Sequence, residues 1–310
     1  MAEEPKKTQH LLSIEQLTEA EIERYVDLAI ELKQQRAADV ASGKEPIAKQ
    51  NWALIFSKSS TRTRVSFEVG IRELGGRAMY FSSRDLQLGR GEPIKDTARV
   101  MGRMIDGAII RTYDQKDVVE FAEFSGVPTI NALTDEEHPC QILADLMTMK
   151  ELLGGWKGRT VAFLGDGDNN MSRSWMWAAE RCGFRLVIGT PKAYQPSEEY
   201  LSRFTSGNIL CEEDPAKAAD GADVLYTDVW VSMGQEEESA KRIADLQGFQ
   251  INDGLLGVAA SDALVMHCLP AYREKEITEK VLERHADTIF REAENRLHAQ
   301  KAVLAVIGER

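Results

Sequence analysis

Apolar runs and amphipathic segments alternate along most of the chain. The first runs are "WALIFS", "RAMYF", "GAIIRT" and "PTINAL", and the helix-length segments between them are "TRVSFEVGIREL", "IKDTARVMGRM" and "QKDVVEFAEFS". Short apolar runs are typical of strands buried on both faces, and strands that alternate with helices form parallel sheets covered on both sides. The first half of the chain is therefore predicted to be an α/β domain.

A second set of alternating segments follows. The runs "TVAFLG", "RLVIGT", "VLYTDV", "ALVMHCL" and "TIFRE" are separated by "SRSWMWAAERC", "SEEYLSRF" and "EITEKVLER". The helical stretch "CQILADLMTMKELL", followed by "GGWKG", is predicted to connect the two sets. The ends are predicted to be helical as well. "SIEQLTEAEIERYVDLAIELKQQ" has Ser13 as a candidate N-cap and ends near Ala38, and "AENRLHAQKAVLAVIG" can pack on either half.

Composition narrows the class of protein. A chain of 310 residues exceeds what one hydrophobic core usually supports, so two domains are expected. The excess of 50 acidic over 38 basic residues argues against general nucleic-acid binding. No apolar stretch approaches the ~20 residues that span a membrane, and the start, "MAEEPKKTQHLL", lacks the features of a secretory signal or transit peptide. We expect a cytoplasmic protein without membrane or nucleic-acid partners.

The cysteines give little sign of a metal or disulfide framework. The four of them are far apart and form no CxxC pair. Such spacing favours free thiols over a zinc site.

The stretch "KSSTRTR" lies between the first strand and the helix that follows it. Helix N-termini present unbonded N–H groups and partial positive charge, which suit phosphate. Ser60, Thr61 and Thr63 add hydroxyl donors, and Arg62 and Arg64 add guanidinium groups that bind phosphate in a bidentate manner. The stretch therefore predicts a phosphate-binding cradle. The alternative is a capped helix with solvated arginines.

Other polar residues are placed at the ends of predicted strands. Ligands of open α/β sheets bind outside the carboxyl ends of the strands. Arg111 ends "GAIIRT", His138 and Gln141 follow "PTINAL", and Asp228 follows "VLYT". These positions predict ligand contacts, with an ammonium group as the partner of Asp228. The alternatives are a surface charge for Arg111, a capped or surface histidine, and a loop-capping aspartate.

The "HCLP" stretch ends the next strand. Neighbouring residues on a strand point to opposite faces, so a catalytic Cys–His pair of His267 and Cys268 is not predicted. Cys268 itself is either a ligand contact or a buried small apolar residue.

The loop "GDGDNNMSRS" has the position of a nucleotide-binding turn but lacks its pattern. Gly165 and Gly167 are present, whereas Asn170 stands where the third glycine belongs, and Thr190 stands where an acidic ribose ligand is expected. This disfavours a nicotinamide-dependent oxidoreductase. The amides of Asn169 and Asn170 instead suit the carboxylate of an amino acid.

Taken together, these stretches resemble the aspartate/ornithine carbamoyltransferase family from about Leu11 to Ile307. "STRTR" and "HPCQ" resemble the carbamoyl phosphate motifs of the family, and "DVWVSMG" and "HCLP" resemble the ornithine-type forms of its amino-acid motifs. "GRGEPIKDTARVMGRMIDGAIIRT" and "EAENRLHAQKAVL" are also similar to family sequence. The chain departs from the family at Ser59, which replaces a common proline, in the length of "GDGDNN" and in "AYREKEIT". The departure in "GDGDNN" leaves the choice between Asn169 and Asn170 open.

The resemblance implies roles for individual residues. Carbamoyl phosphate is expected to contact Ser60, Thr61, Arg62, Thr63, Gln87, Arg111, His138, Gln141, Cys268, Leu269 and Arg296. Ornithine is expected to contact Asn170, Asp228, Ser232 and Met233. The catalytic residues implied are Arg111, His138, Cys268 and Asp228. The reaction implied is transfer of the carbamoyl group to the side-chain amine of ornithine, with no cofactor and no metal.

The resemblance also implies an architecture. Two doubly wound parallel-sheet domains are expected, joined by interdomain helices, with the active site in the cleft. The first, residues 1–145, would bind carbamoyl phosphate and would carry the last helix, about 293–310. The second, residues 146–292, would bind ornithine. A homotrimer or a multiple of trimers is implied, in which the loop "SSRDLQLGRGEP" supplies Gln87 and Arg90 to the neighbouring subunit. A non-catalytic phosphate-binding protein is the remaining alternative.

Overall fold

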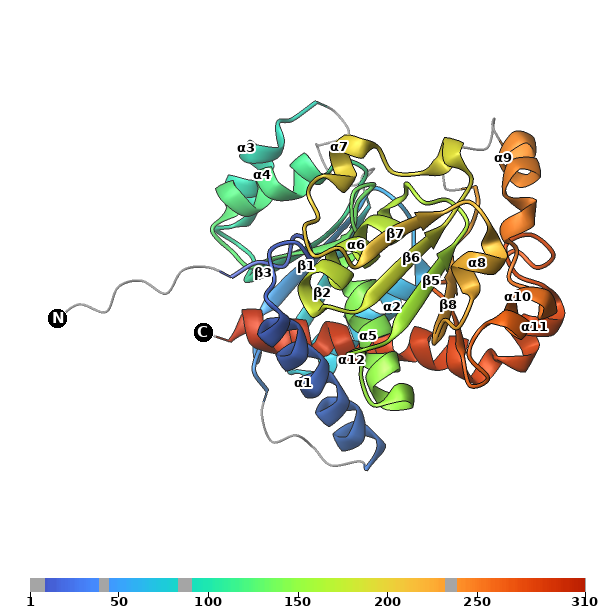
Figure 1. The fold of residues 1–310 in the computed structure, drawn as a ribbon. Coiled ribbons are helices and arrows are strands. Elements are labelled where there is room, and N and C mark those ends of the chain that lie inside the picture. The colour runs from blue at the N-terminus through green and yellow to red at the C-terminus, as the bar shows by residue number, and fades with distance from the viewer. Residues whose placement is uncertain (1–8, 39–44, 83–90, 232–238, 310) are drawn as a thin grey trace. The chain divides into compact units, whose positions relative to one another are not determined.

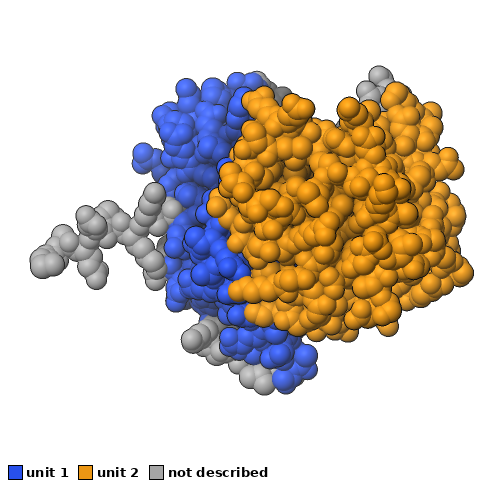
Figure 2. Space-filling model, in the orientation of Figure 1, with its two compact units in different colours: residues 1–147, 296–310 blue, residues 148–295 orange. Residues whose placement is uncertain are grey.

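The computed structural model describes residues 9–38, 45–82, 91–231 and 239–309. The chain divides into two compact units (Figure 2). Unit 1 comprises residues 1–147 and 296–310, and unit 2 comprises residues 148–295. No helix among the described residues is long and apolar enough to cross a membrane.

Unit 1 is built on a parallel four-stranded sheet with the order β2-β1-β3-β4 (Figure 1). The strands are β1 (Asn51–Phe56), β2 (Arg77–Ser82), β3 (Gly107–Arg111) and β4 (Thr129–Leu133). The helices that follow one another in this part of the chain are α1 (Glu19–Ala37), α2 (Thr61–Glu73), α3 (Ile94–Met101), α4 (Gln115–Ser125) and the start of α5 (Pro139–Leu153).

Unit 2 contains a parallel five-stranded sheet with the order β7-β6-β5-β8-β9 (Figure 1). Its strands are β5 (Thr160–Leu164), β6 (Arg185–Gly189), β7 (Ile209–Glu212), β8 (Val224–Thr227) and β9 (Leu264–His267). Its helices are α6 (Asn170–Cys182), α7 (Glu198–Leu201), α8 (Pro215–Ala219), α9 (Ser239–Leu246), α10 (Asp253–Val258) and α11 (Glu279–Arg284), with short 3-10 turns at Lys192–Tyr194 and Gln247–Phe249. The last helix, α12 (Ala286–Gly308), begins in this unit and ends in unit 1. The predicted pair of parallel α/β domains is confirmed.

The strands have continuous apolar sequences because the side chains on both faces of the sheet are buried. In β1, Ala53 and Ile55 belong to a buried cluster with residues of α3 and α4, and the alternate residues Trp52 and Leu54 are also fully buried. Because successive side chains of a strand point to opposite faces, both faces of this sheet are covered. A strand of this kind shows no apolar–polar alternation.

The end of α12 is fixed on unit 1 by close packing and hydrogen bonds. Gly70 of α2 lies against α12, where a Cβ at this glycine would come within 3.1 Å of the Lys301 side chain. The Lys301 ammonium pairs with Glu73 of α2 at 2.7 Å. The Gln50 amide donates to the carbonyl of Gly308 at 2.8 Å. The helix therefore carries its residues to a defined place on unit 1.

Two local predictions were wrong, and one strand was not predicted. Thr18, and not Ser13, caps α1, because Thr18 and Glu21 form a reciprocal capping box. The run "TIFRE" is the first part of α12 and not a strand, since a short apolar run does not by itself distinguish the two. Strand β7 was missed because it lies at the sheet edge and is only partly buried, so that its sequence carries no strong apolar run.

Each sheet has one point at which the strand order reverses. In unit 1 this point lies between β1 and β3, and in unit 2 it lies between β5 and β8. Chain segments that leave neighbouring strands at such a point turn in opposite directions and open a crevice for ligands. The residues after β1, β3, β5 and β8 are thus the natural places for a site.

Candidate active site

The "KSSTRTR" stretch occupies the reversal point of unit 1. Phe56, the last residue of β1, pairs in register with Arg111 at the end of β3, and the Ser57 amide donates to the Arg111 carbonyl at 2.8 Å. Ser60 is the N-cap of α2, and its hydroxyl accepts from the Thr63 amide at 3.3 Å. The first turn of α2 therefore begins beside Arg111. The local sequence achieves this because a serine suits a helix N-cap.

Thr63 links the cradle to the last helix. Its side chain is fully buried, and its hydroxyl oxygen accepts from Arg296 Nη2 at 2.8 Å and from the Ser60 hydroxyl at 3.0 Å. Arg296 is 3% exposed and comes from α12. A guanidinium from the far end of the sequence thus reaches the start of α2.

The two arginines of the stretch have different environments. Arg62 and Thr61 are exposed in the first turn of α2, and no ion pair is recorded for Arg62 within the described part of the chain. Arg64 instead pairs with Glu68 at 2.8 Å and stacks over the ring of Tyr80 at 3.8 Å. The prediction that Arg64 also belongs to the phosphate cradle is therefore not supported by its geometry, because one turn of α2 holds it against its own neighbours.

His138 is buried at the start of α5. Burial holds its pKa well below the usual histidine value, and the nearby cations of Arg296 and Arg111 lower the pKa further. The imidazole is therefore neutral at neutral pH. A neutral ring beside two guanidinium groups can donate or accept a hydrogen bond without adding charge.

Two further residues of "HPCQ" are held in fixed roles. Gln141 is fully buried, and its Nε2 donates to Asp145 Oδ1 at 2.8 Å, which orients the carboxamide. Burial raises the pKa of Cys140 to about 12, so this thiol stays protonated and unreactive.

The loop after β5 lies at the reversal point of unit 2. Asn169 is the N-cap of α6, where its Oδ1 accepts from the Ser172 amide at 2.9 Å. Its Nδ2 is buried and has no hydrogen-bond partner among the residues that the structure describes. Asn170 is the first residue of α6. The cap engages the Oδ1 of Asn169 and leaves its Nδ2 for a ligand. Asn169 and Asn170 therefore both remain candidates for contact with the amino acid. Thr190 accepts from the Gly167 amide at 3.2 Å, so it serves the loop itself.

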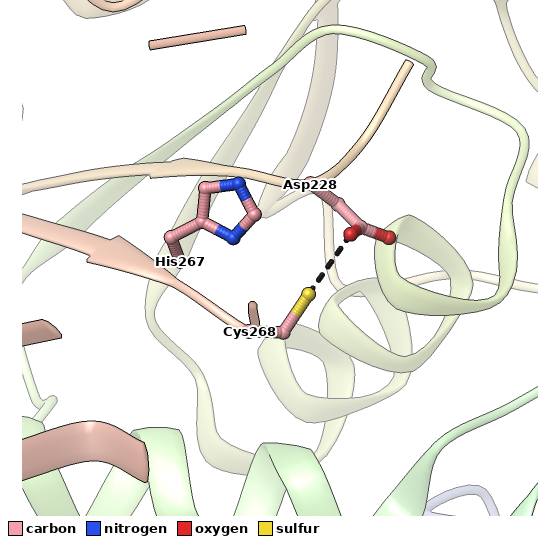
Figure 3. A group of neighbouring side chains, drawn as sticks. All are labelled: Asp228, His267 and Cys268. Carbon is pink, nitrogen blue, oxygen red and sulfur yellow. Dashed lines mark hydrogen bonds between the residues drawn. The ribbon is translucent and has the colours of Figure 1, made fainter. Parts of the chain in front are cut away.

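Asp228 and Cys268 meet at the ends of β8 and β9 (Figure 3). The Cys268 thiol donates to Asp228 Oδ1 at 2.9 Å. Burial raises the pKa of Asp228 above its ordinary value, while the hydrogen bonds from Cys268 and from the Val229 amide oppose this shift. The pair places a carboxylate and a thiol where a cationic amine would be attracted.

His267 and Glu276 support this pair and were not predicted as functional residues. His267 Nδ1 accepts from the Leu269 amide at 2.9 Å, so the proton lies on Nε2, which is 3.2 Å from Glu276 Oε1. Both side chains are buried. Leu269 has a φ of 56°, a conformation that is uncommon outside glycine and often found at functional sites. The only signal in the sequence was a glutamate in "AYREKEIT", whose contact with His267 depends on the fold.

Among the described residues, the side chains of Asp228, His267 and Cys268 form a group that could hold a metal ion. The ligand atoms of Asp228, His267 and Cys268 lie within 4.8 Å of one another (Figure 3). Thiolate and imidazole are typical ligands of zinc. In the structure each of the three is engaged in the hydrogen bonds described above.

Four predicted contact residues cannot be placed. Gln87, Arg90, Ser232 and Met233 lie outside the described residues. Leu269 and Cys268, which the resemblance assigns to carbamoyl phosphate, belong to unit 2.

Comparisons with known proteins cover nearly the whole chain. A curated protein of Akkermansia muciniphila named ornithine carbamoyltransferase is 61% identical over 97% of this chain and 98% of its own length. A solved ornithine carbamoyltransferase from Pyrococcus furiosus has a TM-score of 0.90 and 43% identity, covering 96% of each chain. The anabolic ornithine carbamoyltransferase of Campylobacter jejuni subsp. jejuni has a TM-score of 0.89 and 43% identity, covering 96% of this chain and 98% of its own.

Family models match both units of the sequence. Residues 9–151 match the carbamoyl-P binding domain of aspartate/ornithine carbamoyltransferases, and residues 157–307 match the Asp/Orn binding domain. The first match covers the part of unit 1 that contains the start of α2, and the second covers the part of unit 2 that contains Asp228 and Cys268. The chain belongs to the aspartate/ornithine carbamoyltransferase family.

Proposed function

We propose that the protein is an ornithine carbamoyltransferase, which transfers the carbamoyl group of carbamoyl phosphate to the side-chain amine of L-ornithine and yields L-citrulline and phosphate. The observation that carries the proposal is the contrast between the two reversal points. One gathers guanidinium groups and a helix N-terminus, and the other gathers a carboxylate, a thiol and amides. The first suits a phosphate, and the second suits an amino acid with a terminal amine.

In the proposed site, the first turn of α2 binds the phosphate through Ser60, Thr61, Arg62 and Thr63. Arg111 and His138 contact the carbamoyl carbonyl, and Thr63 helps to polarise it. These assignments are supported by the proximity of Arg111 and Arg296 to the buried imidazole of His138, whose pKa burial and both cations lower. Further contacts to carbamoyl phosphate are assigned to Gln87, Gln141, the main chain of Cys268 and Leu269, and Arg296.

The ornithine contacts are assigned to Asn170, Asp228, Ser232 and Met233. The buried carboxylate of Asp228 supports its assignment, because it attracts an ammonium group of the amino acid. The thiol of Cys268, which is hydrogen-bonded to it, is assigned a place close to the reacting side-chain amine. The domain limits follow the same division: residues 1–145 with 293–310 for carbamoyl phosphate, and 146–292 for ornithine.

The chemistry follows from these roles. The neutral amine nitrogen forms a bond to the carbamoyl carbon, and the carbonyl oxygen becomes an oxyanion. The oxyanion then re-forms the carbonyl as the bond from carbon to the phosphate oxygen breaks, and the departing phosphate takes up the proton that the amine nitrogen loses. Holding the two reactants together supplies about 7–11 kcal/mol of the barrier lowering that such sites achieve. Arg111, His138 and Thr63 stabilise the oxyanion, and the loss of one such donor typically lowers turnover about 10²–10³-fold.

We further propose that the enzyme works in the citrulline-forming direction of arginine biosynthesis, in the cytoplasm. The similar structure from C. jejuni is described as anabolic, which supports the direction. All four cysteines are free thiols, as is usual in a reducing compartment.

Acceptor choice tests the function directly. Purified protein is given carbamoyl phosphate and one acceptor at a time: ornithine, putrescine, N-acetylornithine, N-succinylornithine, aspartate or lysine. Ureido product above an enzyme-free blank is expected with ornithine alone, because Asp228 and the "DVWVSMG" and "HCLP" stretches have the ornithine form. A preference for another acceptor would refute the second substrate, and no product with any acceptor would refute catalysis.

Substitution of Arg62 tests the phosphate cradle. Arg62→Ala removes a charged hydrogen-bond donor from the first turn of α2, so the KM for carbamoyl phosphate should rise about 10- to 100-fold. The matched control is Arg64→Ala, on the same helix, whose guanidinium is bound to Glu68. Initial rates over a range of carbamoyl phosphate concentrations measure both variants. Equal effects of the two substitutions would contradict the different roles of these arginines.

The dependence of kcat/KM for ornithine on pH tests the state of the amine. Attack requires the neutral amine, whose pKa in solution is about 10, so kcat/KM should rise from neutral to alkaline pH. His138 does not titrate in that range because its lowered pKa leaves it neutral throughout. The raised pKa of Asp228 acts in the same direction in acid: its carboxylate is protonated at a higher pH than that of an ordinary aspartate, so activity falls further as the pH is lowered. A profile that is flat from neutral to alkaline pH would contradict this mechanism.

A homotrimer, or a multiple of trimers, is proposed as the assembly, with Gln87 and Arg90 reaching the neighbouring subunit. The support for this assembly is the resemblance of "SSRDLQLGRGEP" to the loop that family members share between subunits. Light scattering should give a multiple of three subunits. At a low carbamoyl phosphate concentration, mixed and reassembled Arg62→Ala and Arg90→Ala subunits should be more active than either variant alone. A fully active monomer, or no recovery on mixing, would contradict shared sites.

A further inference from the structure

Unit 2 contains a buried arginine that the proposed reaction does not use. Arg242 of α9 is 7% exposed, and Asp166, its ion-pair partner in the loop after β5, is 6% exposed. The Nε of Arg242 donates to the carbonyl oxygen of Trp230 at 2.7 Å. One guanidinium therefore joins α9 to the segment after β5 and to the segment after β8.

The first of these segments leads to the asparagines. Asp166 Oδ1 accepts a hydrogen bond from the Asp168 amide at 3.1 Å, and Asp166 Oδ2 accepts one from Arg242 Nη2. The chain then reaches Asn169, which caps α6, and Asn170, which begins it. The ion pair thus fixes the turn that leads to these two asparagines.

The second segment leads back to the carboxylate. Trp230 follows Asp228 by two residues, and its indole lies close to Gly165, where an added Cβ would come within 3.0 Å of Trp230 Nε1. The Thr227 hydroxyl donates to the Leu164 carbonyl at 2.7 Å, directly between the ends of β5 and β8. Both segments are therefore connected at the reversal point, and Arg242 closes the connection on the side of the loops.

Stability alone is a weak reason for such a pair. Two buried charges lose hydration, and replacing such an ion pair by well-packed apolar residues often leaves the stability of a protein unchanged or raises it. Another ion pair on α9, Lys241 with Asp245 at 2.6 Å, shows the usual alternative, because its lysine is 72% exposed. What distinguishes Arg242 is its fork of donors, which holds a carboxylate and a main-chain carbonyl at the same time.

We propose that Arg242 and Asp166 are positioning residues for the acceptor amino acid: they hold the turn with Asn169 and Asn170 in register with Asp228, so that the carboxylate of the acceptor and its side-chain amine are bound at a fixed separation. The inference rests on the proposed function, because it concerns the ornithine half of that site. Arg242 would thus influence which acceptor is bound and how it is oriented, although it does not contact the acceptor.

The test compares steady-state kinetics of Arg242→Gln, Asp166→Asn and the matched control Lys241→Gln in the full-length protein. A misplacement of about 1 Å in a site can cost about 10²-fold, so kcat/KM for ornithine should fall about 10- to 100-fold in the first two variants. The KM for carbamoyl phosphate should remain that of the unchanged protein. Lys241→Gln should leave both values unchanged.

Two further variants separate positioning from folding. Arg242→Lys keeps the charge but not the planar fork, so it should show a smaller loss with ornithine than Arg242→Gln. The double variant Arg242→Met with Asp166→Leu replaces the pair by apolar side chains; it should unfold at or above the temperature of the single variants and still use ornithine poorly. Thermal unfolding and circular dichroism measure the fold.

The outcomes discriminate clearly. Normal ornithine kinetics in folded Arg242→Gln, or in the double variant, would overturn the positioning role. Equal losses for ornithine and carbamoyl phosphate, or a loss of fold that extends to Arg242→Lys, would assign the pair to general stability and would overturn it as well. Failure of the unchanged protein to carbamoylate ornithine would instead refute the proposed function, independently of Arg242.

Discussion

Parallel pairing at the two reversal points is the constraint on which the rest of the structure depends. Because β1 pairs with β3 and β5 pairs with β8, the loops that leave these strands start side by side and diverge. Residues far apart in the sequence, such as Ser60 and Arg111, are thereby brought to the same edge of a sheet. The buried strands provide rigid supports, and the polar loops provide the chemistry.

The charged groups at the carboxyl ends of the two sheets differ in sign, so one sheet favours an anionic ligand and the other a cationic one. At the first edge a helix N-terminus, Arg111 and Arg296 create a positive environment, in which His138 is kept neutral. At the second edge Asp228 is the central charge, and it is hydrogen-bonded to Cys268. A net charge of −12 for the whole chain says nothing of this difference, because short-range interactions of buried groups outweigh the mean field of distant surface charges.

The sequence was informative where a single local pattern decides the structure, and uninformative where contacts over long separations decide it. The alternation of runs predicted both sheets, and the strand-end positions of Arg111 and Asp228 followed from it. The different environments of Arg62 and Arg64 depend on which side of α2 lies against Tyr80 of β2, where Arg64 also pairs with Glu68 of its own helix. The same is true of Glu276, which becomes a partner of His267 only through the folded loop. Of these contacts, only the pair of Arg64 and Glu68, four residues apart on one helix, has a local signal in the sequence.

Residues that do not contact the acceptor can still determine which acceptor is bound, because they hold the loops that carry the contact residues. The carboxylate of Asp228 can attract any cation, and the amides of an asparagine can bind any carboxylate, so these groups alone define a class of ligand and not its length. Length is set by the distance between the two loops, and that distance is held by Thr227, Trp230 and Arg242. Specificity for one amino acid therefore requires that the loops be rigid relative to each other, since a flexible separation would accept shorter and longer acceptors alike. A buried guanidinium with two acceptors satisfies this requirement better than apolar packing, because its hydrogen bonds lose strength over a few tenths of an ångström and in the wrong direction.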